Sequence, residues 1–316
     1  MQKNISKEEY SRLVTLAGRA AIAAASLLIL VKLFAWFATG SSSILAALTD
    51  SLMDVTTSII NLFAIKIALQ PADDDHRFGH GKAESLAGLA QAAFISGSSV
   101  LLMLNGISSL INGNQITASN LGVGVMIFSV VVTIALVSFQ TYIVKKTGSM
   151  AIKADSLHYR TDVFLNGAVL VALVLAGIGW YWADGLFAII VSFYILYGAW
   201  EIGVQSINAL MDKQLPKSDH ELILKTAYKV EGVRGAHDLR TRQSGNTKFI
   251  QLHLELDDDQ SLFEAHNKAD ILEVELKKHF PHADVLIHLD PLSVVEAENI
   301  KFNDTNKLDS SVKDDG

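Results

Sequence analysis

Six long apolar segments constrain this chain more than any other feature, because each is long enough to cross a lipid bilayer. A transmembrane helix needs about 20 consecutive, mostly apolar residues to span the hydrocarbon core. A soluble protein with six buried helices is the alternative to a six-span membrane domain. The predicted helices run roughly over Leu13–Phe37, Ser43–Leu69, Ser85–Ile111, Leu121–Val144, Met150–Gly177 and Ala183–Leu210.

The segments that connect these helices alternate in charge. Three of them, TGSSS, NGNQITASN and GIGWYWAD, contain no Lys or Arg. Because basic connectors stay in the cytoplasm, this alternation predicts a multi-pass membrane protein with both termini cytoplasmic. The same alternation argues against the soluble alternative. The basic residues lie before the first helix and in the other connectors: Lys3, Lys7, Arg12, Arg77, Lys82, Lys145, Lys146, Lys153, Lys213 and Lys217.

The pattern changes after Pro216, where helical and strand periodicities alternate over a short distance. A helix is predicted to begin at Ser218, and two strands should flank a turn at Gly245 and Asn246. An amphipathic helix in SLFEAHNKADILEVELKKHF and a strand in ADVLIHLD complete a small α+β domain of the order α-β-β-α-β. The predicted division is a membrane domain at 1–212, a cytoplasmic domain at 213–292 and a disordered acidic tail at 293–316.

Composition excludes several classes of function. The formal net charge of −7 argues against a nucleic-acid partner, and the absence of cysteine excludes disulfides and thiolate metal sites. In GHGKAES, the glycine that would begin a phosphate-binding loop is missing, since His76 occupies that position, so no ATP machinery is expected. No H-E-x-x-H motif is present, which leaves a zinc protease unsupported.

Two predicted membrane helices carry ionisable residues at helical spacing. Asp50 and Asp54 are four residues apart in the second helix, and His158 and Asp162 are four apart in the fifth. Each pair shares one helix face. A carboxylate near a helix centre costs about 2.5–3.5 kcal/mol on insertion scales, so such residues are functional by default. Three carboxylates and one imidazole suit a tetrahedral Zn²⁺ site, whereas a hydrogen-bond network without an ion and a proton relay are the alternatives.

Two further charged residues lie within the predicted helices. Asp155 is one turn before His158, and we expect its carboxylate to face a vestibule open to the cytoplasm, with a fifth place in the transport cluster as the alternative. Lys32 is expected to extend its ammonium group to the outer membrane interface.

The remaining histidines form two candidate groups outside the membrane. In PADDDHRFGHGKAE, the residues Asp73, His76 and His80 are spaced three and four apart, which predicts either a metal site or a solvated acidic loop. The second group lies in the α+β domain, where a metal site and a scatter of surface histidines are both open. Its members are His237, His253, His266, His288 and Asp290.

From about Leu13 to Pro291 the chain resembles the cation diffusion facilitator family of metal-exporting membrane proteins, and within it the bacterial zinc transporters. The motifs that carry this resemblance are ALTDSLMD, PADDDHRFGHGKAE, ADSLHYRTDVFLNGA, WYWADG, HDLRTRQSG, QLHLELD, EAH and IHLDP.

The resemblance implies a metallochaperone-like fold for the α+β domain and roles for these residues. Asp50, Asp54, His158 and Asp162 match the transport site, and Asp73, His76 and His80 match a loop metal site. Lys82 and Asp212 match a charge interlock that helps to hold a dimer. A binuclear cytoplasmic site, with Asp290 bridging two ions, is matched by His237, His253, His266, His288 and Asp290.

The expected function is therefore secondary transport rather than enzymatic catalysis. The family exports divalent metal in exchange for protons, as a homodimer, by alternating access. Aspartate at the position of Asp50 accompanies looser selectivity, so Zn²⁺ and Cd²⁺ are the expected substrates, with Fe²⁺ or Mn²⁺ as alternatives. His158 is the expected proton carrier. Zn²⁺ is also the expected bound metal, and no organic cofactor is expected. A metal-gated channel is the alternative mechanism.

Overall fold

The computed structural model describes residues 6–39, 42–112, 120–176, 180 and 182–297. The chain divides into two compact units, Met1–Met211 and Asp212–Gly316, each of which is described by itself. The division falls one residue before the end of the predicted membrane domain.

The first unit contains the six predicted helices. Each predicted apolar segment coincides with a helix to within a few residues, although Gly177, the predicted end of the fifth, lies outside the described residues. The largest difference is at the first helix, which begins six residues before Leu13 because its polar first turns continue the helix beyond the apolar segment. The helices are α1 (Lys7–Thr39), α2 (Ser42–Ala68), α3 (Lys82–Asn112), α4 (Asn120–Thr147), α5 (Met150–Ala176) and α6 (Ala183–Leu210).

Four of the six helices, namely α1, α3, α4 and α6, are both long and apolar enough to cross a membrane over their described residues. The other two, α2 and α5, have 27 residues each. At 1.5 Å per residue that is about 40 Å, which exceeds the thickness of a hydrocarbon core. Both helices are therefore long enough to cross a membrane, although some of their side chains lie outside the described residues.

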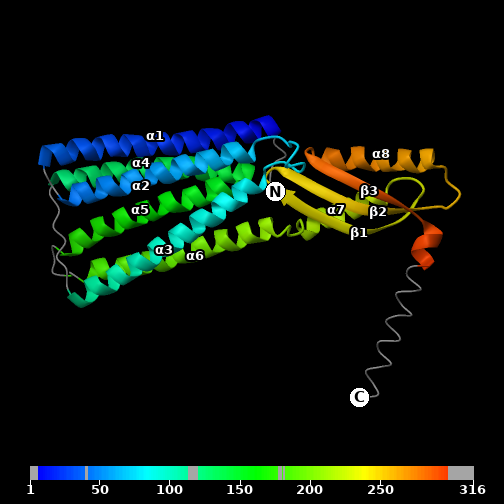
Figure 1. The fold of residues 1–316 in the computed structure, drawn as a ribbon. Coiled ribbons are helices and arrows are strands. Elements are labelled where there is room, and N and C mark those ends of the chain that lie inside the picture. The colour runs from blue at the N-terminus through cyan, green and yellow to red at the C-terminus, as the bar shows by residue number, and fades with distance from the viewer. Residues whose placement is uncertain (1–5, 40–41, 113–119, 177–179, 181, 298–316) are drawn as a thin grey trace, which may run out of the picture. The chain divides into compact units, whose positions relative to one another are not determined.

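The helices of the first unit form a group of four and a pair. α1, α2, α4 and α5 pack against one another, and α3 and α6 lie side by side next to them (Figure 1). A buried carboxylate ties α3 to the group: Glu84 accepts a hydrogen bond of 2.7 Å from the hydroxyl of Tyr10 on α1. Glu84 also accepts from the hydroxyl of Ser149, which precedes α5. These bonds join three helices at one end of the unit.

Two glycines allow the backbones of α3 and α6 to meet. A Cβ atom added at Gly106 would lie 2.9 Å from the carbonyl oxygen of Gly185, and one added at Gly185 would lie 2.6 Å from the carbonyl oxygen of Gly106. Close approach through small residues is a common way for membrane helices to associate, because van der Waals packing replaces the hydrophobic effect in lipid.

We predict that Gly106→Ala lowers the thermal stability of the purified protein, because its methyl group would meet backbone atoms of α6. Overpacking of this kind typically costs about 1–3 kcal/mol. Gly97→Ala is the matched control, since an added Cβ on this residue of α3 has no atom within 4 Å. The measurement is the melting temperature in detergent, and equal melting temperatures for the two variants would contradict the prediction.

The second unit has the predicted α-β-β-α-β order, with a three-stranded sheet in the order β1-β2-β3. β1 and β2 are antiparallel and β2 and β3 are parallel. The predicted hairpin is present, and Gly245 in its turn has a φ of 56°, a conformation that glycine adopts readily. The elements are α7 (Lys217–Ala227), β1 (Val233–Ser244), β2 (Thr247–Leu256), α8 (Leu262–His279) and β3 (Ala283–Pro291).

Two predicted boundaries in this unit need correction. α7 begins at Lys217, one residue before the predicted Ser218, because Pro216 occupies the N-cap position with its fixed φ. Residues 292–297 are helical, so the tail that was predicted to be disordered from residue 293 begins with an ordered turn. The remainder of that tail, 298–316, lies outside the described residues.

The sheet of the second unit has one apolar face and one polar face. Every second residue of β2 from Ile250 to Leu256 is buried against the two helices, where Ile223, Leu272 and Leu276 are fully buried. The intervening residues of β2 therefore point to the opposite face, which the helices do not cover. This polar face carries the histidines of the cytoplasmic group.

Candidate functional site

The structure brings Asp54 of α2 together with His158 and Asp162 of α5. The Nε2 atom of His158 lies 3.0 Å from Oδ1 of Asp54, and these two side chains are 14% and 15% exposed. One ligand atom from each of the three residues lies within 4.8 Å of the others, so the group could hold a metal ion. The fourth predicted member, Asp50, belongs to α2, but its side chain lies outside the described residues. The metal-ligand role of all four residues stays a prediction.

A second hydrogen bond fixes α2 against α5 at the same level. The hydroxyl groups of Ser58 and Tyr159 lie 2.8 Å apart, and each residue is only 1% exposed. Ser58 is one turn beyond Asp54, and Tyr159 is adjacent to His158. This buried contact, which the sequence analysis did not identify, holds the two helices so that their ionisable side chains face each other.

The structure changes the interpretation of Asp155. The residue is completely buried, and Nε2 of Gln140 on α4 donates a hydrogen bond of 2.6 Å to its Oδ2 atom. The expected position in an open vestibule is therefore wrong. Asp155 instead forms a buried polar pair between α4 and α5, one turn from His158. The sequence did not reveal this position because it depends on which residue of α4 lies opposite.

Lys32 also differs from expectation. Its ammonium group donates to the carbonyl oxygen of Ala47 at 3.1 Å and to Oγ of Ser51 at 2.6 Å, both on α2. It therefore turns toward α2 rather than to the membrane interface. Its charge lies next to the segment that carries the predicted transport residues.

The loop between α2 and α3 brings its three predicted residues together. Nδ1 of His76 lies 3.5 Å from Oδ1 of Asp73, and Nε2 of His80 lies 3.4 Å from Oδ2. The backbone N–H of His76 donates to Asp73 at 2.6 Å and, with the nearby imidazoles, holds the pKa of that carboxyl below its usual range. An ionised carboxylate and two imidazoles therefore converge, and the three residues could hold a metal ion.

The polar face of the sheet aligns three histidines, one from each strand. His237 pairs in register with His253 on β2, and His253 pairs with His288 on β3. Asp290 lies within reach of all three: its distances are 2.7 Å from Nδ1 of His253, 3.5 Å from Nε2 of His237 and 3.1 Å from Nε2 of His288. His237, His253 and Asp290 have the mutual spacing of metal ligands. A carboxylate in this central position suits the bridging role predicted for Asp290.

One predicted member of this group is not brought into it within the chain. His266 is an exposed residue of α8, and its Nε2 atom lies 3.5 Å from Asp270 on the same helix. Its role as a ligand stays a prediction. The sequence analysis missed Glu255, whose Oε1 atom lies 2.8 Å from Nδ1 of His237. Its place on the polar face of β2, two residues after His253, was the available signal.

Lys82 and Asp212 belong to different units, so their predicted interlock stays a prediction. The ammonium group of Lys82 donates to the carbonyl oxygen of Leu210 at 3.2 Å. Asp212 has a φ of 57° and lies 3.3 Å from the guanidinium group of Arg242.

Comparison with known proteins decides the family. The family model described as the cation efflux transmembrane domain matches residues 19–211, and the model described as the cation efflux protein cytoplasmic domain matches residues 215–292. The chain belongs to the cation efflux family. Membership in the cation efflux family, also called the cation diffusion facilitator family, makes it a multi-pass membrane transporter that exports metal cations rather than an enzyme. The resemblance noted from the sequence motifs is confirmed.

Individual members of the cation efflux family are similar over nearly the whole chain. The cation-efflux pumps FieF of Salmonella newport (strain SL254) and Salmonella heidelberg (strain SL476) are each 50% identical over 295 residues, which is 93% of this chain and 98% of theirs. Among solved structures, a putative zinc transporter CzrB in its zinc form is 34% identical and covers 25% of this chain and 92% of its own, with a TM-score of 0.24.

We predict that His253→Ala removes at least one tightly bound zinc ion per chain. His253 is the central histidine of the polar sheet face and contacts Asp290. Its loss removes the imidazole that lies between His237 and His288. His220→Ala is the control, because His220 contacts Thr241 and is not part of this group. The measurement is elemental analysis of full-length protein after dialysis against buffered zinc. An unchanged zinc content in His253→Ala would contradict the prediction.

Proposed function

We propose that this cation efflux protein is a homodimeric antiporter of the inner membrane, with cytoplasmic termini, that exports Zn²⁺ and Cd²⁺ in exchange for protons. The transported ion binds between α2 and α5, to Asp50, Asp54, His158 and Asp162. The observation that best supports this proposal is the contact of 3.0 Å between Nε2 of His158 and Oδ1 of Asp54.

That contact supports a shared position for proton and metal. An ionised carboxylate only accepts hydrogen bonds, so with Asp54 ionised the shared proton would be on Nε2 of His158. A metal ligand needs the same nitrogen without its proton, so metal binding must release that proton. Proton and metal therefore compete for one atom, and this competition couples the two fluxes.

The charge of the site supports the exchange in both directions. Three carboxylates and a neutral imidazole around Zn²⁺ have a net charge of about −1, and departure of the ion would leave about −3 between two membrane helices. Carboxylates that share one site disfavour one another's ionisation, so protons replace the metal. His158 is the first carrier, since imidazole titrates nearest neutral pH.

The donor set also bears on which ion is carried. Carboxylates with one imidazole match the tetrahedral coordination of Zn²⁺, and the absence of cysteine from the chain leaves only nitrogen and oxygen donors for Cd²⁺. Fe²⁺ and Mn²⁺ accept the same donors and are the alternative substrates. A metal-gated channel is the alternative mechanism, which the dependence of flux on a proton gradient distinguishes.

The second unit acts as a zinc-dependent clamp between two subunits in this proposal. Its polar sheet face offers imidazoles and carboxylates, which fit resident Zn²⁺ ions. His237, His253, His288 and Asp290 would hold them, with His266 as a further ligand, while the loop site of Asp73, His76 and His80 would hold another ion. Bound zinc would favour one arrangement of the two domains, and Lys82 and Asp212 would help to hold the subunits together.

We predict that Asp54→Ala, Asp162→Ala and His158→Ala each abolish zinc transport in proteoliposomes, because each removes a ligand from a buried site. Glu221→Gln is the control, since this carboxylate is exposed on α7 and belongs to none of the candidate metal groups. Zinc uptake is followed with an entrapped fluorescent indicator. An Asp54→Ala or Asp162→Ala variant that transports zinc at the normal rate would eliminate the proposed site.

We predict that zinc uptake by the wild-type protein is driven by a pH gradient and moves protons in the opposite direction. The rate should rise several-fold when the gradient is imposed, and an entrapped pH dye should report the counterflow. Dissipating the gradient with a protonophore is the control. Zinc flux that is indifferent to the gradient would favour the channel, and the same assay with Cd²⁺, Fe²⁺ and Mn²⁺ ranks the substrates.

A further inference from the structure

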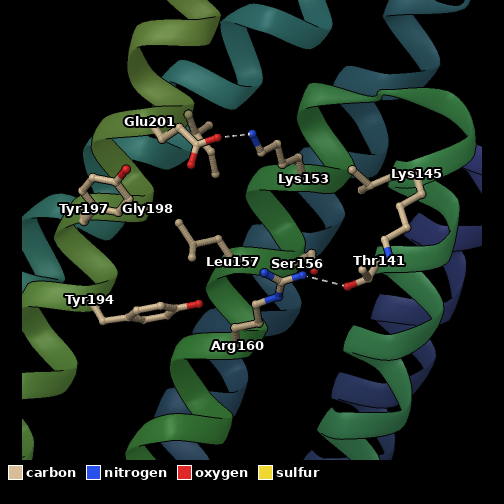
Figure 2. A pocket seen from close by; sticks show the side chains of 12 residues that line it. Thr141, Lys145, Lys153, Ser156, Leu157, Arg160, Tyr194, Tyr197, Gly198 and Glu201 are labelled. Carbon is tan, nitrogen blue, oxygen red and sulfur yellow. Dashed lines mark hydrogen bonds and ion pairs between the residues drawn. The ribbon is translucent and has the colours of Figure 1, made fainter. Parts of the chain in front are cut away.

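A cavity of about 330 Å³ lies between α4, α5 and α6 (Figure 2). It is on the side of α5 that faces away from the candidate transport site. Ser156 and Arg160, which line it, are each two residues from His158 and therefore about 160° around the helix from that imidazole. α5 thus carries the candidate metal ligands on one face and the wall of a separate cavity on the other.

The lining of this cavity is positively charged. It contains Lys145, Lys153 and Arg160, with Glu201 as the one acidic residue of the lining. Lys153 and Glu201 neutralise each other through an ion pair of 2.8 Å. Within the part of the chain that the structure describes, neither Lys145 nor Arg160 has an acidic partner, and the guanidinium group of Arg160 donates only to Oγ1 of Thr141, at 2.9 Å. The charge of Arg160 therefore remains uncompensated between α4 and α5, and Lys145 adds an exposed positive charge near the end of α4.

A buried hydroxyl group in the same lining points to a bound ligand. Ser156 is 3% exposed, and its Oγ atom has no hydrogen-bond partner among the described residues. Figure 2 shows it beside Arg160 and close to Thr141. Buried polar groups are almost always hydrogen-bonded, so this hydroxyl group is expected to have a partner. A ligand bound in the cavity would supply it.

The polar groups of the cavity select one class of ligand. A guanidinium, an ammonium and two hydroxyl groups can all donate hydrogen bonds, which suits an anion with several acceptor oxygens such as a phosphate. The remaining walls are apolar or aromatic, and Tyr194 and Tyr197 are 48% and 71% exposed on the outer surface of α6. A ligand with an anionic head and an apolar body fits both parts.

Two of the three cations lie where the headgroup region of one leaflet would be. Lys145 is two residues before the end of α4, and Lys153 is three residues after the start of α5. Arg160 is about 15 Å from that end of α5, deeper in the membrane, and its side chain reaches Thr141 on α4. Basic pockets between transmembrane helices are known to bind anionic lipid headgroups.

We propose that this cavity binds the phosphodiester headgroup of an anionic phospholipid, drawn from the leaflet at the end of the bundle where α4 ends and α5 begins. Lys145 and Arg160 neutralise the phosphate, and Ser156 and Thr141 donate hydrogen bonds to its oxygens. The acyl chains lie along α6 beside Tyr194. The positive lining repels divalent cations, so the lipid site and the metal pathway remain separate.

Titration of the full-length protein with phosphatidylglycerol, followed by native mass spectrometry, tests this proposal. We expect at least one phosphatidylglycerol to bind more tightly than phosphatidylcholine. Each charge removed, by Lys145→Gln or Arg160→Gln, should weaken that binding about five-fold. Lys66→Gln is the matched control, because Lys66 is an exposed cation near the end of α2 and does not line the cavity. It should bind phosphatidylglycerol as the wild type does.

Equal binding of the two lipids, or unchanged phosphatidylglycerol binding in Lys145→Gln, would overturn the proposal. Lys145 makes no hydrogen bond or ion pair among the described residues, so this variant remains informative even if Arg160→Gln fails to fold. Competition with inorganic phosphate separates the two sources of the anion. Displacement of the lipid by millimolar phosphate would assign the cavity to a free anion and would also overturn the lipid proposal.

Discussion

The contact between His158 and Asp54 joins α5 to α2 in the interior of the first unit. The packing of the other helices makes this contact possible. Ionisable groups are expensive in a bilayer unless they are paired. Ser58 and Tyr159 hold the two helices together beside the pair, and Gln140 donates a hydrogen bond to one oxygen of Asp155 one turn away. α1 packs along α2, and α4 and α6 pack along α5.

The division of the helices into a group of four and a pair indicates which helices would move together. α2 and α5, which carry the candidate ligands, belong to the group of four, whereas α3 and α6 are joined to each other through Gly106 and Gly185. A pair that is tightly packed internally moves as one body more readily than it separates. Glu84 links α3 to α1 and to the start of α5, and the Lys153–Glu201 ion pair links α5 to α6, so movement of the pair at that end must break or carry these contacts.

Local signals made much of the fold predictable. The six helices follow from apolar segments of sufficient length, and the hairpin follows from Gly245 between two runs of alternating residues. The surroundings of a side chain were not predictable where they depend on a partner far away in the sequence. The burial of Asp155 depends on Gln140, the direction of Lys32 depends on α2, and the alignment of His288 with His253 depends on a parallel pairing across α8. Spacing placed Asp54, His158 and Asp162 on shared faces, but only the packing of α2 against α5 made them neighbours.

The alignment of three histidines across the sheet has a consequence for folding. Side chains alternate between the two faces of a strand, so a shift of β3 by one residue would move His288 and Asp290 from the polar face into the apolar core. It would also turn Val285, Ile287 and Leu289 outward. A metal ion held by all three strands would bind only when the strands are paired in the correct register. Metal binding would therefore favour that register while the domain assembles.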